Sequence, residues 1–175
     1  GIDSRNFVNA SLNKIKYDYH GIKNLLLTAG AGFDYYSVIS NNYNTDKYRR
    51  QGALFLGADF RPLPSVGINV LLRQEMVDEE MAPLTPSAGI SYQLLRNEKL
   101  MIKAGAARNF HAPSLNDLYW TPGGNPDLDN ETGYSYEGGV GYEKEIGGVK
   151  FMFDATCFYS DIDNWILWQP DSVFS

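Results

Sequence analysis

Two histidines, His20 and His111, are the first candidates in this sequence for residues that could do chemistry. They lie far apart, and neither has a Cys, Asp or Glu at the spacing of a metal-ligand motif. Cys157 is the only cysteine, which excludes a disulfide framework and a thiolate metal cluster. The spacing therefore argues against a transition-metal site, and no cofactor is expected.

Two acidic runs offer carboxylate oxygens, which are the ligands that calcium prefers. One runs from Asp78 to Glu80, and the other contains Asp127, Asp129 and Glu131. Neither follows the twelve-residue EF-hand pattern, and short acidic runs between strands are usually solvated. A solvated loop is the favoured interpretation of both runs, with calcium binding as the alternative.

The groups of a nucleophilic triad occur close together in His111, Ser114 and Asp117. Catalysis would need the nucleophile and the base within hydrogen-bond reach, and no known nucleophile motif surrounds them. Gly30 and Gly32 lack the third glycine and the following helix of a nucleotide-binding fingerprint. Ser114 and Asp117 fit turn caps better, so the sequence predicts a protein that is not an enzyme.

The composition favours β structure and argues against nucleic-acid binding. Hydrophobic residues make up 43% of the 175 residues, and the 12 Tyr and 17 Gly suit strands and turns. The net charge of −6 does not fit a phosphate-binding surface, which needs clustered Lys and Arg. No stretch approaches the ~20 apolar residues of a membrane-spanning helix, but spanning strands are not excluded.

Apolar and polar side chains alternate along most of the chain, which is the pattern of strands with two unlike faces. The alternation is clear from Leu25 to Tyr35. It recurs in residues 51–60, 66–75, 87–94, 100–109, 134–143 and 149–160. In the first segment the phase slips between Leu12 and Ile15, where we expect a β-bulge. The pattern predicts an all-β fold, an antiparallel up-and-down meander of about eight strands.

Strand length and loop order indicate a transmembrane β-barrel wall. Strands of roughly ten residues match the 9–11 that a tilted strand needs to cross a bilayer, and a face rich in Gly, Ser and Asn suits a wet lumen. Tight turns and long connections alternate strictly. The turns are at 20–23, 62–64, 96–99 and 145–148, and the long connections are at 40–48, 77–85, 110–131 and after 161. Membrane barrels sort their connections in this way, with hairpin turns on the periplasmic side and long loops outside.

Residues 107–132, ARNFHAPSLNDLYWTPGGNPDLDNET, resemble the late-barrel segment of TonB-dependent outer-membrane receptors. In that family a strand runs into an aromatic-x-Ala-Pro-x-Leu-x-x-Leu-Tyr loop and then into Gly-Asn-Pro-x-Leu. The matching residues are Phe110, Ala112, Pro113, Leu115, Leu118, Tyr119, Gly124, Asn125, Pro126 and Leu128. The family's acidic or Pro-Glu step after that leucine appears here only as Asp129-Asn130-Glu131. Residues 160–171 are similar to the strand exit that follows in the cobalamin-receptor-like branch.

The resemblance implies that residues 1–175 are a partial barrel domain, without a plug domain, from a 22-stranded receptor of the cell outer membrane. Such a receptor binds and imports a scarce ligand, which is a metal chelate such as a siderophore, or cobalamin. Its partners would be that small molecule, outer-membrane lipid and TonB, the last through an amino-terminal region that this chain lacks.

The loop at 110–131 is expected to be rigid, because Pro113, Pro122 and Pro126 restrict its backbone. Its aromatic and leucine side chains would then pack over the mouth of the lumen. They either hold the loop to the rim of the barrel or contact the ligand. On the second interpretation, the ligand-binding residues are His111, Asn116, Tyr119, Trp120 and Asn125.

Two other classes remain as alternatives. A self-contained eight-stranded outer-membrane barrel with a structural or adhesive role requires the first and last strands to pair. A soluble lipocalin-type carrier requires the apolar face to point inward. Because an open sheet has bare edges and an exposed apolar face, we expect either closure as a small barrel or edge-to-edge association.

Overall fold

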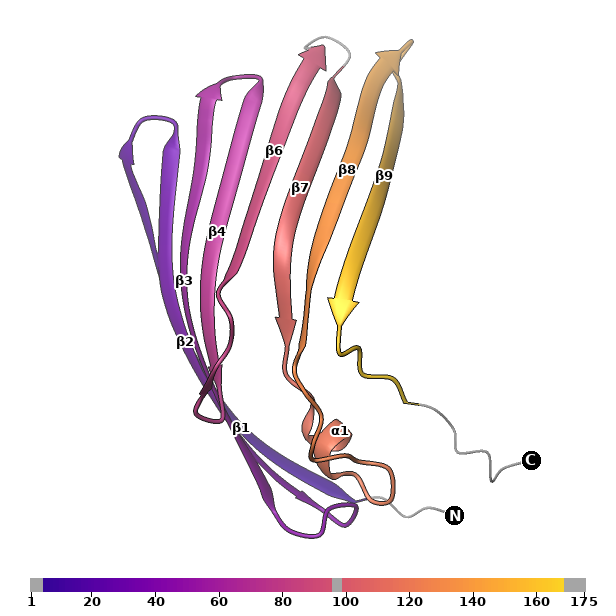
Figure 1. Cartoon of the computed structure of the whole chain (residues 1–175). Coiled ribbons are helices and arrows are strands. Elements are labelled where there is room, and N and C mark those ends of the chain that lie inside the picture. Colours follow the sequence, from indigo (N-terminus) through magenta and orange to yellow (C-terminus); the bar gives the residue numbers. More distant parts are fainter. Residues whose placement is uncertain (1–4, 96–98, 169–175) are drawn as a thin grey trace, which may run out of the picture.

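The computed structural model describes residues 5–95 and 99–168, which form one curved antiparallel sheet and a short helix (Figure 1). The elements in chain order are β1 (Asn6–Ile22), β2 (Leu25–Ser40), β3 (Lys47–Leu63), β4 (Val66–Val77), β5 (Glu80–Met81), β6 (Thr85–Leu95), β7 (Leu100–His111), α1 (Leu115–Tyr119), β8 (Glu131–Ile146) and β9 (Val149–Asp163). Each long strand pairs with the next, and the two-residue β5 pairs with β4. The predicted up-and-down meander is confirmed.

The connections are sorted by length between the two ends of the sheet (Figure 1). Tight turns follow β1, β3 and β8 at one end. At the turn after β8, Gly147 and Gly148 have φ of 61° and 80°, as a tight hairpin with positive φ at both positions requires. The expected turn at 96–99 lies mostly outside the described residues. The other end carries the long connections, which we name loop 41–46, loop 78–84 (containing β5) and loop 112–130 (containing α1).

The two faces of the sheet differ because neighbouring strands are in register. One row of paired residues across β3, β4, β6 and β7 reads Phe60, Ile68, Ile90 and Ala104. The adjacent row, on the opposite face, reads Asp59, Asn69, Gly89 and Gly105. In these rows, the four strands therefore contribute apolar side chains to one face and small or polar ones to the other.

The sheet is a single layer, and no large side chain in the described part of the chain is fully buried. Leu56 and Phe153, on the apolar face, are 62% and 60% exposed. A water-soluble domain would bury such residues against a second layer. The apolar face therefore requires a non-aqueous environment or a partner.

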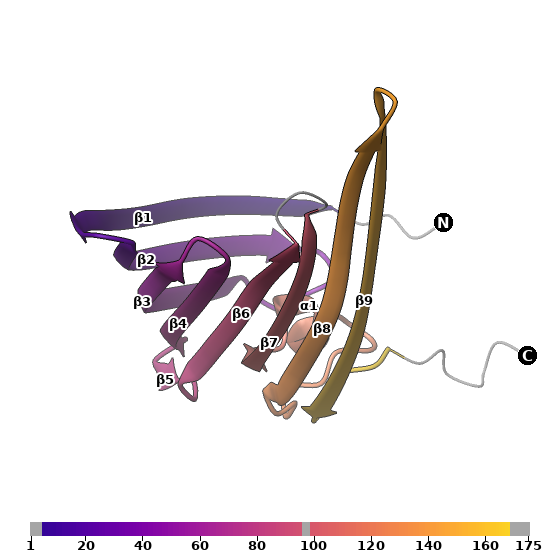
Figure 2. The same ribbon diagram turned by 90° about the horizontal axis from the view of Figure 1, so that it is seen from above.

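The sheet is open, as expected for part of a barrel wall, so of the two arrangements expected for its edges, closure as a small barrel is not found. Figure 2 shows a curved wall that begins at β1 and ends at β9. Within residues 5–95 and 99–168, β1 and β9 are edge strands that do not pair with each other. The curvature accumulated over eight long strands does not bring the two edges together. An open wall also does not enclose the cavity of a lipocalin-type carrier.

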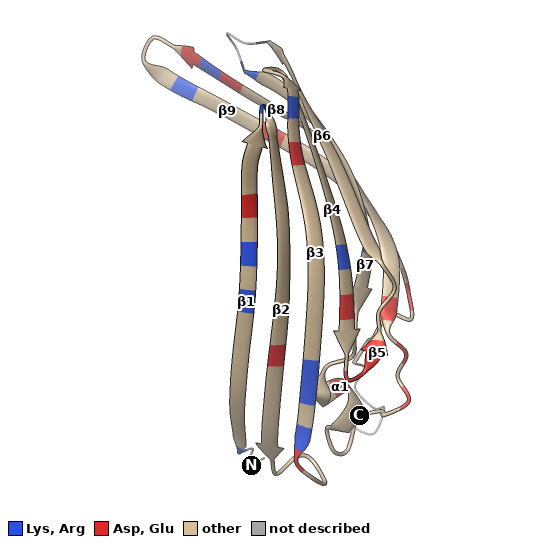
Figure 3. Ribbon diagram, turned by 90° about the vertical axis from the view of Figure 1, so that its left-hand side faces the viewer, with Lys and Arg blue, Asp and Glu red and all other residues tan. Residues whose placement is uncertain are grey.

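The strands are longer than predicted. β1, β2, β3, β8 and β9 contain 15 to 17 residues, more than a tilted strand needs to cross a bilayer. Figure 3 shows the charges of β3 at its two ends, with a long uncharged stretch between them. Backbone pairing therefore continues past the apolar band into segments whose side chains suit water.

The bulge expected between Leu12 and Ile15 is also wrong. β1 pairs with β2 in unbroken register from Asn6 to Tyr19, and the register shifts only beyond Tyr19, next to the turn. Leu12 therefore lies on the polar face, where it is 65% exposed. An apolar contact is not required of Leu12 at this position, so the backbone hydrogen bonds between β1 and β2 stay regular.

In the described ranges, no helix has the length and apolar character to cross a membrane.

Candidate ligand-binding loops

The three long loops meet at one end of the sheet, and α1 lies beside the loop between β2 and β3 (Figure 1). The Tyr43 hydroxyl donates a hydrogen bond to Asn116 Oδ1, and the Thr121 backbone N–H donates to the Asn42 carbonyl at 2.9 Å. Lys47 Nζ lies 3.8 Å from the centroid of the Tyr119 ring, a close cation–π contact. Loop 112–130 is therefore docked on loop 41–46 and the start of β3.

Ser114 and Asp117 cap α1. The Asp117 N–H donates to Ser114 Oγ at 3.2 Å, and the Ser114 N–H donates to Asp117 Oδ2 at 2.8 Å, a reciprocal capping box. Trp168 Nε1 donates to Asp117 Oδ1 at 2.7 Å, which ties the segment after β9 to the same loop. The prediction that these two residues cap a turn is confirmed, and both are occupied in holding the loop together.

The capping interactions determine the protonation of Asp117. Partial burial alone would raise the pKa of its carboxyl, but hydrogen bonds from Ser114 and Trp168 lower it below the ordinary value of 3.8. Partial burial raises the pKa of the Tyr43 phenol above 10.0, so this group remains a neutral donor to Asn116 at physiological pH.

Acidification is expected to loosen this capped turn. Because the folded loop lowers the Asp117 pKa, its stabilising contribution is fully present above about pH 3.8 and is lost as the pH falls through the lower folded value. The indole N–H signal of Trp168 in NMR spectra of the protein should move over that range. Asp117→Asn should abolish the movement and Asp127→Asn should keep it; a signal that still moves in Asp117→Asn would contradict the assignment.

Arg49, at the start of β3, is 8% exposed. Among the residues that the structure describes, it is the one charged residue that is buried. Its Nε lies 3.1 Å from Asp78 Oδ2, and its Nη1 donates to the Pro113 carbonyl at 2.5 Å. Asp78 Oδ1 in turn accepts from the Arg50 backbone N–H at 2.8 Å. One guanidinium therefore connects loop 78–84, loop 112–130 and the sheet.

A recess opens beneath α1 at this end of the sheet, on the face that carries the polar side chains of β2 and β3. It has a volume of about 390 Å³, and we name it the mouth recess. Its lining includes the polar residues Asn6, Tyr36, Tyr43, Arg49, Gln51, Ser114 and Asn116 and the apolar residues Val8, Val38 and Leu115. It is the place where residues from loop 41–46, loop 112–130 and three strands meet.

Of the five predicted ligand-binding residues, the structure places one in the lining of the mouth recess. Asn116 lines the mouth recess, and Tyr119 stacks with Lys47. Asn125 accepts from the Asp127 N–H through its side chain, which shapes the turn. His111 is paired in the β7–β8 ladder, and the Trp120 N–H closes the last turn of α1. None of these last four residues lines the recess.

Both acidic runs border a separate cavity of about 390 Å³ between loop 78–84 and loop 112–130. Asp78, Glu80, Asp127 and Asp129 contribute to its lining. Within the described ranges, however, no three His, Cys, Asp or Glu side chains gather as a group that could hold a metal ion.

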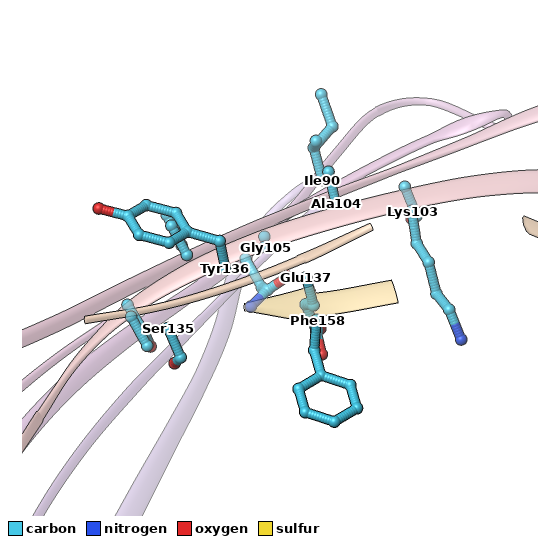
Figure 4. A pocket seen from close by; sticks show the side chains of 15 residues that line it. Ile90, Lys103, Ala104, Gly105, Ser135, Tyr136, Glu137 and Phe158 are labelled. Carbon is cyan, nitrogen blue, oxygen red and sulfur yellow. The ribbon is translucent and has the colours of Figure 1, made fainter. Parts of the chain in front are cut away.

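The middle of the polar face holds a further hollow, of about 480 Å³. Figure 4 shows Lys103, Glu137 and Phe158 on one side of the sheet and Ile90 on the other. The Lys103 ammonium lies 3.3 Å from Asp154 Oδ1. Lys103 pairs with Gly139 and Asp154 with Gly141 of β8, which lies between their strands. Small residues and paired charges give this face the character of a hydrated lumen wall.

Comparison with known proteins agrees with this architecture. Residues 4–175 match the family model described as TonB dependent receptor-like, beta-barrel. The vitamin B12 transporter BtuB of Vibrio vulnificus (strain CMCP6) is 30% identical over 156 residues, which cover 83% of this chain and 24% of the transporter. The vitamin B12 transporter BtuB of Photobacterium profundum is 36% identical over 74 residues, or 41% of this chain and 11% of that protein.

Solved structures share the fold. The siderophore receptor PirA from Pseudomonas aeruginosa superposes with a TM-score of 0.73 at 22% identity, over 91% of this chain and 32% of that chain. A mutant ferric enterobactin receptor PfeA from the same organism, in complex with enterobactin, gives 0.72 at 20% identity, over 91% and 27%. The chain thus spans about a quarter of the length of the Vibrio vulnificus transporter. Its fold is that of part of an outer-membrane receptor barrel, and the matched family is not one of enzymes. The chain belongs to the TonB-dependent receptor-like β-barrel family, as the motif in residues 107–132 predicted.

Proposed function

We propose that this chain is part of the barrel wall of a receptor that binds and imports a scarce ligand, a metal chelate such as a siderophore, or cobalamin. Loop 41–46, loop 78–84 and loop 112–130 would face the exterior and recognise the ligand, and the tight turns would face the periplasm. TonB would supply the energy through a part of the receptor outside this chain.

The observation that carries this proposal is the docking of the three long loops on one another. A loop of the length of 112–130 is usually either functional or disordered. Here it is held by the Tyr43–Asn116 hydrogen bond, by Arg49 and by Trp168. Ordered loops that surround a recess at the barrel mouth are what ligand capture requires.

Deletion of residues 114–129 from the full-length receptor is expected to abolish ligand uptake while the barrel still inserts. Uptake is measured in whole cells, and insertion is measured by heat-modifiable migration of the extracted protein. Because the Glu131–His111 pairing of β7 and β8 is kept, the barrel wall should form normally. Normal uptake by the inserted deletion variant would show that the loop has no role in recognition.

A further inference from the structure

We infer that the mouth recess accepts an uncharged part of the ligand that carries carboxamide or hydroxyl groups, and that it discriminates against polyanionic chelates. This inference rests on the proposed function, because it specifies the ligand class of the same loops.

The first argument comes from the groups that line the recess. Three are amides (Asn6, Gln51 and Asn116) and two are phenols (Tyr36 and Tyr43). The Ser114 hydroxyl also lines the recess; it already accepts from the Asp117 N–H and can still donate. The Tyr43 hydroxyl donates to Asn116 Oδ1, which leaves the Asn116 amide N–H groups as donors. Together these groups can both donate and accept hydrogen bonds, which matches a partner that does the same. Val8, Val38 and Leu115 add apolar contact area. Neither a carboxylate nor a lysine contributes to this lining.

The second argument concerns Arg49, the one cationic group in the lining. Its guanidinium already forms an ion pair with Asp78 and a hydrogen bond to the Pro113 carbonyl, and it is 8% exposed. An anionic ligand would have to compete with both of these partners. The recess therefore offers no uncompensated positive charge to a carboxylate or catecholate oxygen.

The third argument is the charge of the surrounding loops. Loops 41–46, 78–84 and 112–130 contain no Lys or Arg, and their acidic residues are Asp46, Asp78, Glu79, Glu80, Asp117, Asp127 and Asp129. Among the basic residues at this end of the sheet, Lys47 stacks on Tyr119, and Arg50 Nη1 lies 3.3 Å from Glu79 Oε1. The resulting field repels a polyanion as it approaches the recess.

Equilibrium binding to the purified full-length receptor tests the inference. Cyanocobalamin and a neutral ferric trihydroxamate serve as the uncharged probes, and ferric enterobactin serves as the anionic probe. We expect at least one uncharged probe to bind at least tenfold more tightly than ferric enterobactin. Tighter binding of ferric enterobactin, or binding of neither uncharged probe, would overturn the inference.

Substitution of Gln51 shows whether the recess itself sets this preference. Gln51→Leu and Gln51→Glu should each weaken binding of the uncharged probe about tenfold, because a hydrogen-bonding partner is lost or acquires a charge. Gln51→Lys should shift the preference toward ferric enterobactin. Gln93→Glu makes the same amide-to-carboxylate change near the tight-turn end and should alter nothing. Unchanged selectivity in all three Gln51 variants would refute the inference, whereas failure of the proposed function would appear as normal uptake after loop deletion.

Discussion

The full-length receptor with Arg49→Met is expected to lose the ordered packing of loop 112–130 and most of its ligand uptake, while still inserting into the outer membrane. Methionine fills a similar volume but leaves the Pro113 carbonyl and the Asp78 carboxylate without their shared donor. An unsatisfied buried acceptor costs roughly 1–3 kcal/mol. Pro113 is buried, whereas Asp78 is partly exposed and regains some hydration. The destabilisation should therefore be local to the loops.

Arg50→Met is the matched control for Arg49→Met. Arg50 pairs with Glu79, but both side chains are largely exposed, and such surface pairs contribute about 0–1 kcal/mol. Hydrogen exchange measured by mass spectrometry should show faster exchange across residues 112–130 in Arg49→Met and unchanged exchange in Arg50→Met. Equal protection of loop 112–130 in the two variants would mean that Arg49 does not hold the loops together.

The strands were predictable from sequence because each strand has one face toward an apolar environment and one toward water. The side chains alternate in polarity accordingly. Ile68, Ile90 and Ala104 indicate the apolar face. Asn69, Gly89 and Gly105 indicate the polar face. Strand ends were not predictable, because backbone pairing continues where the side-chain alternation has stopped. A barrel wall was predicted, but whether it closes as a small barrel was left open, because side-chain alternation gives the faces of a sheet and not its curvature.

The candidate site was predictable only in part. Of the five ligand-binding residues predicted in or beside loop 112–130, Asn116 lines the mouth recess, and its contact with a ligand stays a prediction. Its partner Tyr43 lies 73 positions earlier and meets it only because the curved sheet brings α1 beside loop 41–46. Arg49 was missed because an arginine at the start of a strand resembles a solvated charge. Its burial depends on two loops that approach from later in the chain.

A positive charge on the apolar face is expected to destabilise the barrel far more than the same charge on the polar face. Ala88 and Ser87 are adjacent, small residues of β6 that point to opposite faces. Ala88 pairs with Val70 and Ala106, and Ser87 pairs with Leu71 and Ala107. Because both side chains are small, substitution by arginine removes little packing. The comparison therefore isolates the environment of the charge.

Ala88→Arg should reduce the unfolding free energy of the full-length receptor by about 2–4 kcal/mol if the residue faces the middle of the bilayer. Ser87→Arg should cost less than about 1 kcal/mol, since its guanidinium can reach the hydrated lumen side. Urea titration of the receptor in phospholipid vesicles, followed by tryptophan fluorescence, measures both values. Equal losses of unfolding free energy in the two variants would show that both faces have the same surroundings. That result would contradict a wall with one face toward lipid. A larger loss in Ser87→Arg would mean that the sheet is oriented the other way, with its apolar face turned inward.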